Sequence, residues 1–434
     1  MKGAVKRVYE QSATAQPWTM YGRQQRWTYL VVLFLVSTSN YFDRHVVSVL
    51  LEPIKHEFHV SDARLGLLSG LAFAVFNAIF GLPIARWADR YNRRTILTVA
   101  LAAWSALTVL CGAAQTFWQL ALARVGVGAA ESASVPPAQS LIVDYFRPDQ
   151  RATALSIFTA AGTAGNLLAL GLGAYVASAL GWRAAFFLAG APGVLLALVA
   201  RVTLAEPRLG RENQSLPAET EGLKESLTRL YRKRSFTYGL VGCILCFLLS
   251  YGALVFVPSF LIRELHASLR QVGAVYGSVI GVASVVGTLG GGLLADRLGS
   301  RDVRWLAWLP SIACITTGVL YVAAFSASSF WIFMMLAFVA YMLLTGGLPP
   351  IFAAIHAVCG SRRRATAVAV VLFSATLIGG GFGPLLTGYL SDLFKTSLGI
   401  DGLRYSLILL MIPVIIGGIF FYMFGRVMTQ DLEQ

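Results

Sequence analysis

The sequence contains little charge and few long polar stretches. Only 13% of its 434 residues are Asp, Glu, Lys or Arg, whereas a soluble domain has about 25%. Hydrophobic residues make up 56% and the mean hydropathy is +0.67, so the chain carries more apolar surface than a water-soluble fold could bury. The composition therefore excludes a soluble protein and indicates an integral membrane protein.

Several functional motifs are also missing. The chain has no G-x-x-x-x-G-K-[ST] segment, so ATP is not expected to drive its activity. No nucleophile–base pair and no metal-ligand cluster stands out, and we therefore expect neither an enzyme nor a metal or organic cofactor. No soluble segment forms a patch of basic and aromatic residues, so the net charge of +14 does not indicate nucleic-acid binding.

Cysteine and histidine are scarce, with five residues of each. The cysteines fall in or at the ends of apolar stretches, where free thiols pack as small hydrophobic groups, and we expect no disulfide. Cys243 and Cys246 form a C-x-x-C inside such a stretch, which favours a packed pair over a redox or metal site. His56 and His59 are assigned to a polar outer loop, residues 52–62, and not to a metal site.

What the chain does have is a series of apolar stretches long enough to cross a bilayer as helices, each of about 20 residues or more. They indicate an all-α membrane protein with twelve transmembrane helices. The stretches are residues 27–51, 66–85, 95–115, 118–142, 152–179, 183–204, 236–262, 271–294, 305–325, 330–355, 365–390 and 403–425.

A polar segment of mixed charge, residues 205–235, divides the twelve stretches into two sets of six. Its residues 219–234 fit either an amphipathic helix on the inner membrane surface or a solvated tether. The expected organisation is an N-terminal segment (1–26), a six-helix bundle (27–204), the linker (205–235), a second six-helix bundle (236–426) and a tail (427–434).

Basic residues are concentrated on one side of the predicted membrane. Most Lys and Arg residues lie before residue 27, in the linker, and in the short loops on the same side. The positive-inside rule makes this side cytoplasmic, so both termini are expected in the cytoplasm. We expect a multi-pass protein of the cell inner (plasma) membrane, and a monomer, because nothing in the sequence requires an oligomer.

Four charged residues interrupt two of the apolar stretches. Asp43 and Arg44 lie in the first, and Arg124 and Glu131 share one helix face in the fourth. A charge at the bilayer centre costs about 2.5–3.5 kcal/mol. Two acids and two arginines sum to zero, so we expect two internal pairs that line a polar cavity, as in the core of a transporter.

The two halves carry matching loop signals at nearly equal offsets. Asp89-Arg90 and Asp296-Arg297 lie 207 residues apart, and R-A-T-A begins at both Arg151 and Arg364, 213 residues apart. The match indicates an internal duplication. These signals resemble the G-x-x-x-D-R-x-G-x-R-R signature of the major facilitator superfamily, although Ala85 and Asn92 replace glycines in the first copy. The resemblance implies two pseudo-symmetric six-helix bundles. Acids and arginines in these loops can pair, and we expect them to hold the cytoplasmic side shut until the site opens inward. The expected gate residues are Asp89, Arg90, Arg93, Arg94, Asp296, Arg297, Arg301, Arg151 and Arg364.

A cavity between the halves would have unlike walls, because all four mid-membrane charges lie in the N-terminal half. One charged and one aromatic, apolar wall favour an amphipathic substrate with an anionic head, which arginine binds through paired hydrogen bonds. Asp43 and Glu131 are candidates for proton coupling, since changes in pairing alter how a buried acid holds its proton. A proton gradient is the expected driving force, with Na⁺ as the alternative. The expected substrate contacts are Arg44, Arg124, Tyr41, Tyr251, Phe256, Tyr276, Tyr341 and Phe373.

Three segments carry a more specific pattern. They are N-Y-F-D-R at 40–44, D-R-Y-N-R-R at 89–94, and 124–134 with its continuation at 149–158. These segments resemble the spinster branch of the superfamily, whose members are related to carriers of sphingosine-1-phosphate and lysophospholipids. The resemblance implies that Asp43 and Glu131 couple transport to protons, and that Arg44 and Arg124 bind the acids or a lipid head group. It therefore implies proton-coupled transport of a lysophospholipid or sphingoid phosphate by alternating access. Ala129 and Ala130 depart from the family pattern, and no spinster motif is evident in the second half.

Three alternatives stay open. The organic-anion/proton symporter branch shares the N-Y-x-D-R start and the Arg-to-Glu spacing, but a small sugar acid would need polar groups on both walls. A multidrug exporter usually carries G-P-x-x-G-G in its fifth helix, whereas residues 162–166 lack the proline. A sensor or scaffold on this fold would have no use for the gate and cavity charges.

Overall fold

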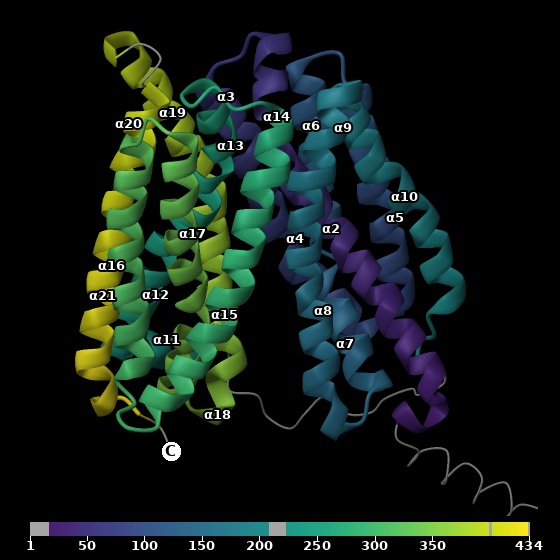
Figure 1. Cartoon of the computed structure of the whole chain (residues 1–434). Coiled ribbons are helices and arrows are strands. Elements are labelled where there is room, and N and C mark those ends of the chain that lie inside the picture. Colours follow the sequence, from purple (N-terminus) through teal and green to yellow (C-terminus); the bar gives the residue numbers. More distant parts are fainter. Residues whose placement is uncertain (1–16, 208–222, 399–401, 433–434) are drawn as a thin grey trace, which may run out of the picture.

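The computed structural model describes residues 17–207, 223–398 and 402–432, and within these ranges the chain forms helices and no strand. Figure 1 shows two helical bundles side by side, with helices α2 to α10 in one and α11 to α21 in the other. The start of α2 and the end of α21 lie at the same end of the molecule, which we call the terminal end. The opposite end is called the distal end.

The N-terminal half begins with a short 3₁₀ turn and ends before the linker. Two of its long helices contain a π-helical segment, η2 and η3. The symbol η also marks the short 3₁₀ turns η1 and η8. Its elements are η1 (Pro17–Met20), α2 (Arg23–Phe58), α3 (Asp62–Gly66), η2 (Leu67–Leu71), α4 (Ala72–Arg90), α5 (Arg93–Ala113), α6 (Phe117–Glu131), α7 (Val135–Tyr145), α8 (Pro148–Leu168), η3 (Ala169–Gly173), α9 (Ala174–Leu180) and α10 (Trp182–Thr203).

The C-terminal half repeats this arrangement after one short helix. Its elements are α11 (Leu223–Arg232), α12 (Arg234–Phe247), η4 (Leu248–Ala253), α13 (Leu254–Arg263), α14 (Leu269–Gln271), η5 (Val272–Tyr276), α15 (Gly277–Gly299), α16 (Trp305–Ser326), α17 (Phe330–Gly346), α18 (Leu348–Ser374), η6 (Ala375–Phe382), α19 (Gly383–Leu398), α20 (Gly402–Leu409), α21 (Met411–Val427) and η8 (Met428–Gln430).

The twelve-helix prediction is confirmed, although length and composition alone mark only ten spans among the described residues. The remaining two crossings are α2 and the pair α6–α7. In α2 the charges predicted from the sequence lower the hydropathy, whereas α6 and α7, with 15 and 11 residues, are each too short to count as a span alone. The two crossings that a test of length and composition misses are therefore the two that hold the candidate site.

The break between α6 and α7 has a local cause. Pro136 and Pro137 occupy the first turn of α7, and proline has no backbone N–H to continue the hydrogen bonds of α6. As a result α6 ends at Glu131, which is buried, with 2% of its surface exposed. The acid thus stands at a helix end inside the bundle, where its carboxylate can reach a neighbouring helix.

The prediction of a polar outer loop is wrong. Residues 52–62 were expected to form a polar outer loop, but α2 continues to Phe58 and ends only at His59, which has a left-handed backbone with φ 49°. Glu52 is buried rather than solvated. The helix continues because the charges of its last turns are paired with residues of neighbouring helices, so they need no water.

Part of the linker also has a described structure. Residues 223–232 form α11, which contacts α12 and α18 of the C-terminal half. Leu230 is buried and Tyr231 is half exposed. At least one leucine of this helix therefore packs against protein, whereas residues 208–222 of the predicted linker lie outside the described residues.

The halves meet closely at the distal end. There α3 packs against α19, α2 against α13 and α9 against α14. The π-helical segments take part, since η2 contacts η6 and η3 contacts η5. Such segments interrupt the regular α-helical hydrogen bonding and often mark functional positions.

The crossing of α3 and α19 is tight enough to require glycine. A methyl group at Gly388 would overlap the backbone carbonyl of Asp62. Gly388→Ala is therefore expected to push the halves apart at the distal end and to populate a state that is open there. Spin labels at Gln115 and Ser328, in distal loops of the two halves, would report this as a longer distance by double electron–electron resonance. An unchanged distance distribution would contradict the expectation.

Candidate functional site

The four predicted mid-membrane charges come together where α2 meets α6. Asp43, Arg124 and Glu131 are at most 2% exposed. Arg44 Nη2 donates to Glu131 Oε2 at 3.3 Å, and this is the ion pair of the group. Arg124 Nη1 donates to the backbone oxygen of Asp43, also at 3.3 Å. The sequence predicted two acid–arginine pairs, and the structure contains one.

Asp43 is the one residue of the four whose side chain has no hydrogen-bond partner in this group. Neither oxygen of its carboxylate accepts a hydrogen bond of ordinary geometry within the described chain, although the Thr108 side chain and the Arg124 guanidinium lie beside it. Glu131 Oε1 also accepts none. A buried carboxylate without hydrogen bonds is unfavourable, and protonation relieves it. Both acids therefore retain oxygen atoms that can take up a proton.

An aromatic ring that sequence reasoning did not identify lies within this group. Phe73 of α4 is 5% exposed. The Arg44 guanidinium carbon lies over its ring at 4.6 Å from the centroid, and the Arg124 carbon at 5.5 Å. Nothing in the sequence distinguishes this phenylalanine from the other 25. Only the packing of three helices brings it to the arginines.

A cavity of about 230 Å³ lies between the halves, next to these charges. Tyr41 and His45 flank Arg44 on α2, and both line the cavity. Arg44 itself keeps 21% of its side chain exposed. Across from it lie Tyr251 and Tyr341, so three of the predicted aromatic contacts are present.

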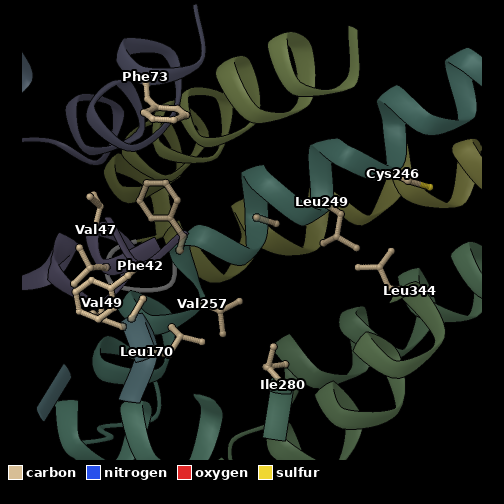
Figure 2. Close-up of a cluster of buried hydrophobic side chains, with 14 of the residues drawn as sticks. Phe42, Val47, Val49, Phe73, Leu170, Cys246, Leu249, Val257, Ile280 and Leu344 are labelled. Atoms are coloured by element: carbon tan, nitrogen blue, oxygen red, sulfur yellow. The ribbon is translucent and has the colours of Figure 1, made fainter. Parts of the chain in front are cut away.

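The rest of the lining is mostly apolar or small. Figure 2 shows Leu249 and Leu344 pointing toward one another from different helices, with Ile280 on a third. Of these, Ile280 and Leu344 reach the cavity surface. The remaining lining residues are Gly162, Thr163, Asn166, Leu167, Phe247, Gly281, Ser284, Thr345 and Leu348.

Five predicted substrate contacts do not line this cavity: the two arginines, Arg44 and Arg124, and three aromatic residues. Phe256 and Tyr276 are buried, because α13 and η5 pack against the N-terminal half where the bundles close. Phe373 of α18 is 52% exposed and also lies outside the lining. Aromatic composition alone could not separate residues at the depth of the cavity from those deeper in the distal contact.

A second group of buried charges joins the halves at the distal end. Asp62 of α3 accepts from Arg263 of α13 at 2.8 and 3.0 Å, and from Lys55 at 2.6 Å. Arg263 also binds Glu52 at 2.6 Å. Asp392 of α19 accepts from the backbone N–H groups of residues 62 and 63, and thus caps α3. We call these five residues the distal charge cluster.

The distal charge cluster was not predicted, although a signal was present. Glu52, Lys55 and Asp62 had been assigned to a solvated loop because they follow an apolar stretch. Arg263 stands at the end of another apolar stretch on the same predicted side. Acids and a base at span ends on the same side of the membrane suggest that they pair. One sequence does not show which acid pairs with which base across the two halves.

The predicted gate residues at the terminal end make contacts within their own half, as far as they are described. Arg93 is fully buried and binds Asp144 at 2.7 Å and Glu206 at 2.6 Å. Arg151 donates to the carbonyl oxygens of Val143 and Phe146.

Four further gate residues have described side chains. Arg94 donates to the Leu204 carbonyl. Asp296, Arg297 and Arg301 are exposed. The side chains of Asp89, Arg90 and Arg364 lie outside the described residues. The ion pairs of Arg263 with Glu52 and with Asp62 join the halves at the distal end, and a gate at the terminal end stays a prediction.

This architecture is that of a membrane transporter, and comparison with known proteins agrees. A family model described as Major Facilitator Superfamily matches residues 33–316. An MFS-type efflux pump of Mycolicibacterium smegmatis is 34% identical over 416 residues, which cover 95% of each chain. The chain belongs to the major facilitator superfamily and is a multi-pass membrane transporter, not an enzyme.

Within the superfamily the chain is of the spinster type. Protein spinster homolog 1 of Xenopus tropicalis is 26% identical over 94% of this chain and 82% of its own. The sphingosine-1-phosphate transporter SPNS2 of Mus musculus is 29% identical over 90% and 75%. A crystal structure of a bacterial homolog to the human lysosomal transporter Spinster, inward-facing and unoccupied, superimposes with a TM-score of 0.87 at 30% identity, covering 95% of this chain and all of that one.

Proposed function

We propose that the protein is a proton-coupled secondary transporter that moves an amphipathic anion, of the lysophospholipid or sphingoid-phosphate type, by alternating access as a monomer. The observation that carries this proposal is the pairing of Arg44 with Glu131 beside Tyr41 and His45, which line a cavity whose other wall is mostly apolar. Both termini would be cytoplasmic. The described state, closed by the distal charge cluster, would then be inward-facing, like the similar crystal structure.

The cavity size supports a head-group site. Its volume of about 230 Å³ is below the roughly 300–1,000 Å³ of pockets that enclose whole drug-sized ligands. It suits a phosphate or carboxylate head near Arg44 better than a whole lipid. The acyl chain would extend along Leu167, Ile280 and Leu344, which are part of the cavity wall.

The proton would act through competition for the arginine. While Glu131 is ionised it would hold Arg44 through the 3.3 Å contact between the two side chains. A proton on Glu131 removes that charge and leaves Arg44 to pair with the substrate anion. Loss of the proton on the other side would reclaim Arg44 and release the anion, so that each transport step is linked to one titration. Asp43, which lacks hydrogen bonds to its carboxylate, offers a second proton site beside Arg124.

Flux measurements in proteoliposomes test this proposal. A labelled lysophosphatidate is expected to cross the membrane faster when a pH gradient is imposed, while glucuronate and the cation ethidium are not expected to respond. Glucuronate flux alone would support an organic-anion symporter. Ethidium flux alone would support an exporter, the reading favoured by the 34% identity to an MFS-type efflux pump. Lipid flux that ignores the pH gradient would contradict proton coupling.

A further inference from the structure

The contacts of the two buried arginines differ from those expected of a balanced set of charges. Arg44 has one carboxylate partner at 3.3 Å. Arg124 forms no ion pair among the described residues, and it contacts the Asp43 carbonyl and the Phe73 ring. The Nε atoms of both arginines lack hydrogen-bond partners. Two largely buried cations therefore lie close together, and only one of them is held by an ion pair.

Phe73 is the side chain that both arginines share. An aromatic face attracts a guanidinium through the quadrupole of the ring, and the attraction grows when water is excluded. The ring is 5% exposed, so both contacts are largely desolvated. An aliphatic side chain of similar size would fill the space but would attract neither cation.

The position of the ring is fixed by close packing between α4 and α6. A methyl group at Gly128 would lie 2.5 Å from the backbone oxygen of Phe73, so only glycine lets α4 approach α6 this closely. Asn77, one turn further along α4, donates its side-chain N–H to the Gly128 carbonyl at 3.2 Å. Gly128 lies between Arg124 and Glu131 on α6. The backbone that carries the ring is thus attached to the segment that carries the charges.

We infer that Phe73 is a positioning residue of the anion site, which keeps Arg44 and Arg124 desolvated and directed toward the cavity while the acids change protonation. The inference rests on the proposed function for its consequence in transport. Without the ring, Arg44 would depend on Glu131 alone, and a proton on Glu131 would release the guanidinium to water rather than to the substrate.

The effect on transport has a definite sign. Phe73→Leu removes the attraction of the ring, so the arginines interact more strongly with the acids. This stabilises the ionised form of the acids. A higher proton concentration is then needed to free Arg44, and the pH at half-maximal lysophosphatidate flux should move down. KM for the lipid should rise about tenfold, since two cation–ring contacts are lost. Phe73→Trp keeps a ring and should restore both values toward wild type.

A matched control separates positioning from simple packing. Phe158 of α8 is 3% exposed in the same half, and no arginine among the described residues lies over its ring. Phe158→Leu removes the same volume from a buried site. It is expected to lower the melting temperature much as Phe73→Leu does, but to leave KM and the pH profile unchanged.

A chemical measurement tests the inference independently of any substrate. Phenylglyoxal attacks accessible guanidinium groups, and peptide mass spectrometry follows Arg44 and Arg124 separately in the detergent-purified protein. Both should react at least about threefold faster in Phe73→Leu than in wild type or Phe158→Leu, because the ring no longer covers them. Equal rates in the two leucine variants would overturn the positioning role. Faster arginine modification without any lysophosphatidate flux would instead uphold it and refute the proposed substrate.

Discussion

Glu131→Gln is expected to abolish uptake driven by a pH gradient while leaving the protein folded. Glutamine keeps the shape of the side chain but cannot exchange a proton. The Arg44 guanidinium, 3.3 Å from this carboxylate, then loses its anion permanently. An uncompensated buried charge costs about 3–5 kcal/mol, so Arg44 should hold the substrate anion instead and release it slowly. Gradient-driven lysophosphatidate flux should fall by about two orders of magnitude, as measured in proteoliposomes.

The C-terminal half provides a control with nearly the same chemistry. Glu264 pairs with Arg404 at 3.4 Å, and its side chain is 2% exposed, compared with 3.3 Å and 0% for Glu131. This pair stands at the end of α13, whose C-cap is Glu264, whereas Arg44 lies between Tyr41 and His45, which line the cavity. Glu264→Gln should therefore change stability but preserve the pH dependence of flux. If both variants lose the pH response equally, Glu131 has no particular part in coupling.

Arg263→Gln is expected to open the distal end. Arg263 is the cation of the C-terminal half that holds Glu52 and Asp62 of the N-terminal half, and its side chain is only 16% exposed. Its removal leaves two buried acids near Lys55 alone, at a cost of about 3–5 kcal/mol to the closed state. This corresponds to a shift of at least about a hundredfold in the equilibrium between closed and open states. The spin-label distance between positions 115 and 328 should become longer.

An exposed pair at the same end serves as the comparison. Arg183 binds Glu57 at 2.6 Å, but the two side chains are 37% and 41% exposed. Such surface pairs contribute about 0–1 kcal/mol, so Arg183→Gln should leave the distance distribution unchanged. Asp62→Asn tests the same cluster from the other half and should act in the same direction as Arg263→Gln. A closed distal end in both cluster variants would show that backbone packing alone holds the halves together.

The sequence identifies the fold because membrane helices follow a simple rule. Apolar length predicts the spans, and the paired loop motifs reveal the duplication. A test of helix length and composition does not mark α2, because of its charges, or α6–α7, because the break between them leaves two short helices. Asp43, Arg44, Arg124 and Glu131 were identified as candidates because a charge inside the bilayer is energetically unfavourable unless function requires it.

The ion-pair partners of buried charges and the depth of aromatic side chains in the bundle were harder to predict from the sequence. Glu52 and Asp62 looked solvated because the residue that neutralises them, Arg263, lies about 200 positions away and on the other half. Phe73 has no charge to mark it, and its role depends on the approach of α4 to Gly128. Phe256 has the right chemistry for the cavity but lies in the distal contact, a difference that helix packing decides. One sequence specifies which groups need partners better than it specifies which partners they find.

The separation of the buried charges along the chain has a consequence for how the protein is made. Arg44 and Glu131 are 87 residues apart, and Asp62 and Arg263 are 201 residues apart. Synthesis proceeds at about 5–20 residues per second, so Arg44 waits on the order of ten seconds for its anion after it leaves the ribosome. During that time α2 is not stable in the lipid bilayer as a single transmembrane helix. We expect it to stay beside the insertion machinery until α6 has been synthesised. The contacts of the distal end are expected to form only after the second half has been translated.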